Sequence, residues 1–153
     1  MDAEVYPDPR VIDFITQHFI PVRVHVKDNA ADFKRLGDRF DAHWTPTTLI
    51  VDDTGTERFR IEGFLPTDDF LSQLALGLAK AAFARQDYPA AQRLYRDVLE
   101  RFPNSDAAPE AQYWAGVSRY RATKDAGALK ETGQAFRERY QDSAWAKKAS
   151  VWT

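Results

Sequence analysis

Apolar residues in the first part of the chain switch between helical and strand spacing. After Asp8-Pro9 they recur at helical intervals, which predicts a short amphipathic helix over about 9–19. Every second residue from Ile20 to Val26 is apolar, and most of these side chains are β-branched, which predicts a strand. Helical spacing then returns and predicts a second helix over about 30–41.

Trp44-Thr45-Pro46-Thr47 interrupts this pattern. The residues that follow, 48–51, form a short apolar run that is typical of a buried strand. Asp52-Asp53-Thr54-Gly55 predicts a hairpin turn, because Gly55 can adopt a positive φ. Residues 57–64 are then the return strand, and a further helix starts at about residue 67.

Helical spacing dominates from Phe70 to the end of the chain. A break at Asp87-Tyr88-Pro89 separates two helices, and Pro103-Asn104 ends the second of them. Another pair follows, with apolar positions from Ala111 to Tyr140. The segment from Ala144 is long enough for one capping helix.

This helical part repeats itself. Residues 104–114 and 142–152 match at a constant offset of 38, with Ser, Ala, Ala and Trp in register. A fixed period in this range indicates stacked supersecondary units. Small residues, Ala79 and Gly116, occupy equivalent places in the first helix of each unit, where they let two helices approach closely.

Composition narrows the function classes. Residues 1–66 carry a net charge of −4 and residues 67–153 one of +2, so neither part has the basic excess that binding to a nucleic-acid backbone needs. No signal peptide and no membrane-spanning apolar run is present, and we expect a soluble cytoplasmic protein. The three histidines lack metal-ligand spacing, no cofactor motif occurs, and Asp52-Asp53 is interpreted as a polar turn.

The order of helices and strands in the first 76 residues is similar to that of a known fold family. Val22 to Val26, then Trp44-Thr45-Pro46-Thr47 leading into the strand at 48–52, then Gly63 after the return strand, resemble the C-terminal two-thirds of a thioredoxin fold. In that family a Cys-x-x-Cys pair lies a few residues upstream of the segment that resembles Met1–Pro9. The chain contains no cysteine, so taken alone it should not catalyse thiol–disulfide exchange, which needs an attacking thiolate.

The resemblance implies that Thr45–Pro46 is a cis peptide in a loop that meets partner backbone, with Trp44 beside it. An ordinary trans turn proline, with Trp44 as a packing residue, is the alternative. The strand that normally precedes the cysteines is also missing. The strands at 20–26 and 48–52 therefore either pair directly or gain a strand from another molecule, for example in a homodimer.

The helical part resembles the tetratricopeptide repeat. Ala91, Tyr95 and Pro103 fit the spacing of that family, whereas Gly133 and Gln141 depart from it, and the period exceeds the roughly 34 residues of the family. The resemblance implies a groove lined by the first helix of each hairpin, at Lys80, Tyr113, Val117 and Arg121. The alternatives are plain helical hairpins and, for these four residues, a solvated helix face.

The fold class is therefore α/β plus all-α. We expect a thioredoxin-like α/β sandwich, incomplete at its N-terminus, over residues 1–76, and TPR-like hairpins over 67–153 that share the helix from about 67. The preferred function is a redox-inactive module that binds a protein or peptide. The alternative is the remainder of a thiol–disulfide oxidoreductase, for which a Cys-x-x-Cys encoded in frame upstream of Met1 is the test.

Overall fold

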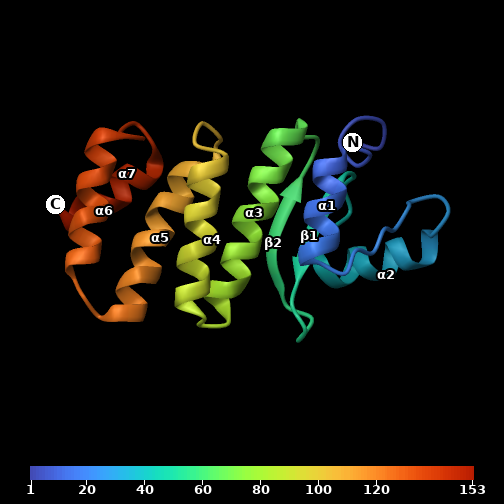
Figure 1. Cartoon of the computed structure of the whole chain (residues 1–153). Coiled ribbons are helices and arrows are strands. Elements are labelled where there is room, and N and C mark those ends of the chain that lie inside the picture. Colours follow the sequence, from blue (N-terminus) through green and yellow to red (C-terminus); the bar gives the residue numbers. More distant parts are fainter. The chain divides into compact units, whose positions relative to one another are not determined.

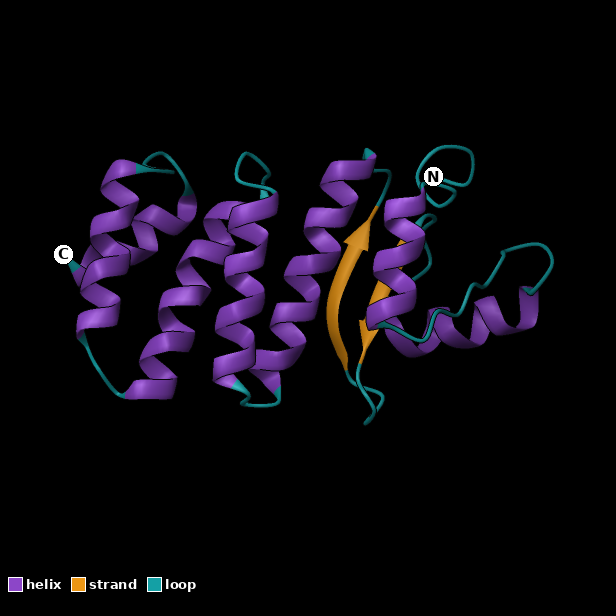
Figure 2. Cartoon of the chain, viewed as in Figure 1, coloured by secondary structure: helices purple, strands orange, loops and turns teal.

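The computed structural model describes residues 1–153, which form two compact units, Met1–Thr67 and Asp68–Thr153. Figure 1 shows the order of the elements along the chain. Figure 2 shows that unit 1 combines helices with one small sheet, whereas unit 2 consists of helices. None of the helices is both long and apolar enough to cross a membrane.

Unit 1 contains helices α1 (Pro9–His18) and α2 (Ala30–Phe40) and strands β1 (Thr47–Val51) and β2 (Glu57–Glu62). Both helices lie where apolar spacing predicts them. Asp8 caps α1, since its carboxylate accepts a hydrogen bond from the Arg10 backbone N–H at 2.9 Å. Pro9 occupies the first turn of the helix, where its missing N–H leaves no bond unmade.

The sheet of unit 1 is an antiparallel hairpin of β1 and β2. Thr48 faces Ile61 and Ile50 faces Phe59 in the register, with an irregularity between Ile50 and Val51. Ile50 and Ile61 are buried, and the buried apolar residues of unit 1 also include Val5, Val11 and Phe14. The predicted turn is present, with Gly55 at φ +78° and its N–H donated to the Asp52 carbonyl at 2.9 Å.

The predicted strand at 20–26 is wrong. These residues adopt no regular secondary structure, and Ile20 and Val22 are 95% and 80% exposed. An apolar alternation produces a strand only when a neighbouring strand satisfies its N–H and C=O groups. The sheet contains β1 and β2 alone, so direct pairing between residues 20–26 and β1 does not occur.

Unit 2 is a series of antiparallel helices. Its elements are α3 (Thr67–Ala84), α4 (Tyr88–Arg101), α5 (Ala107–Thr123), α6 (Gly127–Glu138), α7 (Ala144–Ala149) and a final 3-10 turn (Ser150–Trp152). The Asp87 carboxylate caps α4 by accepting from the Ala90 N–H at 3.2 Å. Tyr140 was expected on α6, but the helix ends at Glu138 and Tyr140 has a left-handed φ of +62°.

The 38-residue repeat has a structural counterpart. The hydroxyl of Ser105 donates to the Phe102 carbonyl at 2.8 Å, and the hydroxyl of Ser143 donates to the Tyr140 carbonyl at 2.7 Å. Both pairs of residues are related by the same offset, and each serine precedes the first helix of the next unit. The sequence repeat therefore marks equivalent turns between hairpins.

Candidate functional site

The loop before β1 carries the first group of predicted site residues. The peptide bond between Thr45 and Pro46 is cis, and Trp44 is 71% exposed. The Pro46 carbonyl accepts a hydrogen bond from the Gly63 N–H at 2.8 Å, and Gly63 has a φ of +85° that favours glycine. The end of β2 thereby holds the loop, and the Trp44 indole is left open to solvent.

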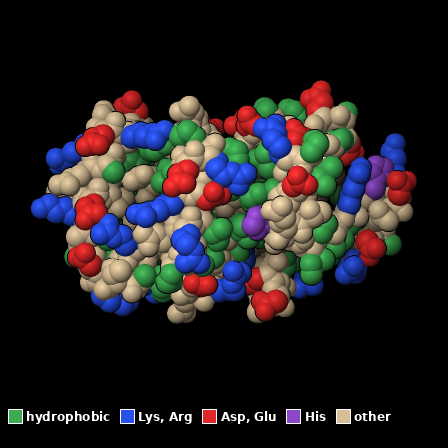
Figure 3. Space-filling view, viewed as in Figure 1, with side chains coloured by type: hydrophobic (Ala, Val, Ile, Leu, Met, Phe, Trp, Pro, Cys, Tyr) green, Lys and Arg blue, Asp and Glu red, His purple; other side chains and the backbone are tan.

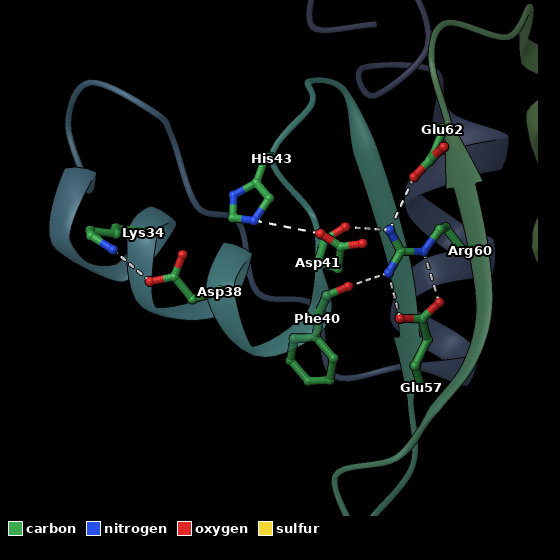
Figure 4. A network of polar contacts seen from close by, with 8 residues as sticks. All are labelled: Lys34, Asp38, Phe40, Asp41, His43, Glu57, Arg60 and Glu62. Atoms are coloured by element: carbon green, nitrogen blue, oxygen red, sulfur yellow. Dashed lines mark hydrogen bonds and ion pairs between the residues drawn. The ribbon is translucent and has the colours of Figure 1, made fainter.

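Polar contacts also fix the end of α2 to the hairpin (Figure 4). The Arg60 guanidinium forms ion pairs with Glu57 at 2.7 Å and Glu62 at 3.0 Å. It also donates to the carbonyls of Phe40 and Asp41, the last residue of α2 and the residue after it. The hydrogen bond from Arg60 lowers the pKa of the Glu57 carboxyl. Because every acceptor around Arg60 belongs to the framework of unit 1, we interpret this network as structural.

A second carboxylate, that of Asp52, organises the β1–β2 turn. Its Oδ1 atom accepts hydrogen bonds from the Thr54 N–H, the Thr54 hydroxyl and the Thr56 N–H, while Oδ2 accepts from Arg58 Nε at 2.6 Å. These contacts, the Thr54 hydroxyl first, hold the pKa of Asp52 well below its ordinary value. A carboxylate committed to four donors is a turn clamp, as the sequence predicts.

The second candidate site is a cluster of half-buried aromatic rings in unit 2. We call it the aromatic face, and its members are Phe83, Tyr88, Tyr113, Trp114, Trp145 and Trp152. Tyr113 lies at its centre, stacked on Trp152 with ring centroids 4.7 Å apart and 5.2 Å from the Trp145 ring. Such pairs stabilise beyond their buried area, by about 0.5–1.5 kcal/mol each.

Two cationic side chains lie over these rings. Lys148 Nζ lies 3.9 Å from the centre of the Trp145 ring, and the Arg121 guanidinium lies 4.7 Å from the centre of the Tyr88 ring. Arg121 also donates to the Tyr88 hydroxyl at 2.5 Å. Lys80 on α3 pairs with Glu110 on α5 at 2.5 Å. The aromatic face is therefore flanked by positive charge that the protein itself partly neutralises.

The structure places the predicted groove residues as follows. Tyr113, Val117 and Arg121 follow each other one turn apart on α5, so they share one side of that helix. Lys80 reaches α5 through Glu110. Tyr113 and Val117 are half-buried and Arg121 is exposed. The other predicted residues, Trp44, Thr45 and Pro46, belong to unit 1.

Comparison with protein-family models agrees with this architecture. The model of the thioredoxin-like domain matches residues 1–77, just over half of the chain. The chain belongs to the thioredoxin-like family. The tetratricopeptide repeat model matches residues 73–105, which include the α3–α4 hairpin from Gln73 onward. No curated protein and no solved structure matches the chain.

These matches confirm both resemblances identified from the sequence, including a thioredoxin-like domain without the cysteine pair. The tetratricopeptide match ends before α5, in agreement with the departures at Gly133 and Gln141 in the second hairpin. Gly133 has a structural reason, because a Cβ there would lie 2.8 Å from the Thr153 side chain and 3.3 Å from the Ala149 carbonyl. The missing side chain gives the C-terminal segment room against α6.

Sequence reasoning missed most of the aromatic face. It selected Tyr113 from the face but not Trp145 or Trp152, although Trp152 forms part of the 38-residue repeat and corresponds to Trp114. The recurrence of tryptophan at equivalent places was the available signal. This recurrence indicates the repeat but does not by itself show that the rings share one surface.

Proposed function

We propose that this thioredoxin-like protein is a binding module that holds a segment of a partner protein on the aromatic face of unit 2. The observation that carries the proposal is the placement of Tyr113 between Trp145 and Trp152. Tyrosine and tryptophan are enriched at protein interfaces because they offer large, rigid contact area together with a polar group. Tetratricopeptide repeats typically mediate contacts between proteins, which supports the same reading.

The side chains around the rings suggest the chemistry of the partner segment. Val117 and the rings supply apolar contact area, and Arg121 and Lys148 supply positive charge, whereas the charge of Lys80 is paired with Glu110. A partner segment that combines apolar or aromatic side chains with acidic ones would contact both the apolar area and the positive charges. Electrostatic attraction of this kind speeds association and selects among partners more than it adds affinity.

Site-specific photo-crosslinking in cells tests the proposal. A benzophenone side chain placed at Val117 should capture a discrete partner, whereas the same group at Arg93, on the outer side of α4, should not. Arg121→Glu should reduce capture from position 117, because it reverses a charge beside the rings while leaving α5 helical. Equal capture from both positions, or capture that is indifferent to Arg121→Glu, would count against the aromatic face.

We further propose that Trp44, Thr45 and Pro46 form a second contact surface, on unit 1. Trp44 is largely exposed, and tryptophan is enriched among the residues that contribute most to protein binding. Trp44→Ala should weaken partner capture without changing the stability of unit 1, because the indole has few packing contacts to lose. Unchanged capture by Trp44→Ala would restrict binding to unit 2.

Self-association by strand addition is a separate proposal for unit 1. It is supported by β1, which pairs with β2 on one side only, and by the exposed alternating residues Ile20 and Val22. An open strand edge presents unpaired N–H and C=O groups that a further strand can satisfy. A second copy of the chain can supply residues 20–26 as that strand.

A further inference from the structure

A groove on unit 2 lies apart from the aromatic face. It runs between α4 and α6, with α5 as its floor, and encloses about 290 Å³. The middle of its floor consists of small residues such as Ala115 and Gly116. The polar side chains that line the rest of the groove are those of Gln92, Arg96, Gln112, Arg119, Glu131 and Thr132. Figure 3 shows lysine and arginine side chains interspersed with aspartate and glutamate side chains over these helices.

Some polar side chains of the groove have a hydrogen-bond or ion-pair partner within the protein, and others have none. Arg119 pairs with Glu131 across the groove and Thr132 donates to the Ala128 carbonyl at 2.7 Å, so these three belong to the wall. The Arg96 guanidinium, in contrast to that of Arg119, forms no ion pair within the protein. The side-chain amides of Gln92 and Gln112 make no hydrogen bond to the protein. The groove therefore offers one free cation and two free amides.

Helix geometry orders these groups along the groove. Gln92, Arg96 and Leu99 share one side of α4, and Gln112 and Arg119 share one side of α5. Consecutive helices run antiparallel in the hairpin stack, so Gln92 lies at the end where Arg119 pairs with Glu131, and Gln112 lies at the other end. Arg96 falls between the two amides. Seven residues of helix span about 10 Å, the length of about three residues of extended chain.

From this arrangement we propose that the α4–α6 groove binds an extended peptide segment whose central residue is Asp or Glu. The Arg96 guanidinium would bind the carboxylate, and each glutamine amide would bind main-chain groups on one side of it. An amide both donates and accepts, so it suits the peptide backbone, and a guanidinium suits a carboxylate. Because amides lie on both sides of Arg96, the chain must continue in both directions, which selects an internal acidic residue over a C-terminal carboxylate.

The site differs from the aromatic face in its residues and its chemistry. The two share helices α4 and α5, but no residue that lines the groove belongs to the ring cluster. If no peptide binds in the groove, the proposed function of the aromatic face still stands. If no partner binds at the aromatic face, the proposal for the groove still stands. The two can be tested on one preparation of the full chain.

The experiment is a titration of the isotope-labelled full chain, followed by NMR, with the acetylated and amidated peptide Ala-Ala-Glu-Ala-Ala. The side-chain amide signals of Gln92 and Gln112 should shift together. Replacing the central Glu with Gln in the peptide should weaken binding by roughly tenfold, because a charge-assisted hydrogen bond is lost. Arg96→Ala should weaken it by a similar factor, and Arg93→Ala, one turn earlier on α4, should not.

Each other result overturns the proposal. No shift at Gln92 and Gln112 up to about 10 mM peptide excludes even a millimolar site. Equal binding of the Glu and Gln peptides would show that Arg96 does not bind the carboxylate of the central residue. Preferential binding of Ala-Ala-Ala with a free carboxylate assigns the groove to chain ends. Shifts confined to the indole signals of Trp145 and Trp152 assign the peptide to the aromatic face.

Discussion

Gly116 on α5 lies directly against Thr132 on α6. A Cβ built at position 116 would overlap the Thr132 hydroxyl oxygen and lie 2.8 Å from both Cβ and Cγ2 of the same residue. The Thr132 side chain is held in place by its hydrogen bond to the Ala128 carbonyl. Glycine at position 116 therefore sets how closely the two helices of the second hairpin approach.

Gly116→Ala should destabilise unit 2 by about 1–3 kcal/mol, because the added methyl group forces α5 and α6 apart. In an open helix the same change would stabilise by roughly 0.5–1 kcal/mol. Urea unfolding followed by far-UV circular dichroism, which is dominated by the helices, measures the difference. The cost should shrink in a Thr132→Ala background, where Oγ1 and Cγ2 are removed. Gly127→Ala is the matched control, since only the exposed Asp125 carboxylate lies near its Cβ position, and it should stay within about 0.5 kcal/mol.

The helices, and the close approach of two of them at Gly116, could be predicted from the sequence. A helix satisfies its own backbone, so the spacing of apolar residues predicts it, and the alignment of Ala79 with Gly116 pointed to a close helix approach. The segment at 20–26 failed for the opposite reason, since a strand depends on a partner that its own sequence does not contain. The α4–α6 groove was equally hidden, because its residues come from three helices whose arrangement no local pattern encodes.

Two fully buried helical serines should respond in opposite ways to replacement by alanine. Ser72 donates its hydroxyl to the Asp69 carbonyl at 2.7 Å, whereas the Ser118 hydroxyl has no hydrogen-bond partner. Ser72→Ala should cost about 1 kcal/mol, and Ser118→Ala should be neutral or stabilising, because it removes an uncompensated polar group. Helix propensity changes equally in both, so the difference in urea midpoint isolates the hydrogen bond. Equal effects would mean that the Ser118 hydroxyl has a partner in solution.

Trp152 should anchor the C-terminal segment through its stack on Tyr113. Trp152→Ala should destabilise unit 2 by about 2 kcal/mol, since it removes an aromatic pair and exposes the Tyr113 ring. Hydrogen exchange should show faster opening of α7 than of α5. Val151→Ala, one residue earlier and 81% exposed, should change stability by less than about 0.5 kcal/mol. Comparable effects of the two variants would show that the stack does not hold this segment.

The Asp52 clamp should make unit 1 sensitive to acid. Because the folded-state pKa of Asp52 lies below the ordinary 3.8, its contribution is complete above that value and is lost as the pH falls through the folded pKa. Asp52→Asn should lower the urea midpoint of the Ile50 and Ile61 amide signals at about pH 7 and pH 5. The gap to the unmodified chain should narrow from about pH 3 downward. Asp53→Asn, at the exposed neighbouring position, should leave the midpoint unchanged, and a gap that widens in acid would refute the clamp.

Self-association through residues 20–26 should depend on the exposed apolar side chains and on the free edge of β1. Light scattering after size-exclusion chromatography should show a dimer population that grows with concentration, because an exposed alternating segment and an open edge can pair between copies. Val22→Pro should abolish it by removing one N–H donor and restricting the backbone. Thr16→Ala, on the exposed side of α1, should leave the dimer intact. A monomer at every concentration would end the strand-addition proposal, and a dimer that survives Val22→Pro would place the interface elsewhere on the chain.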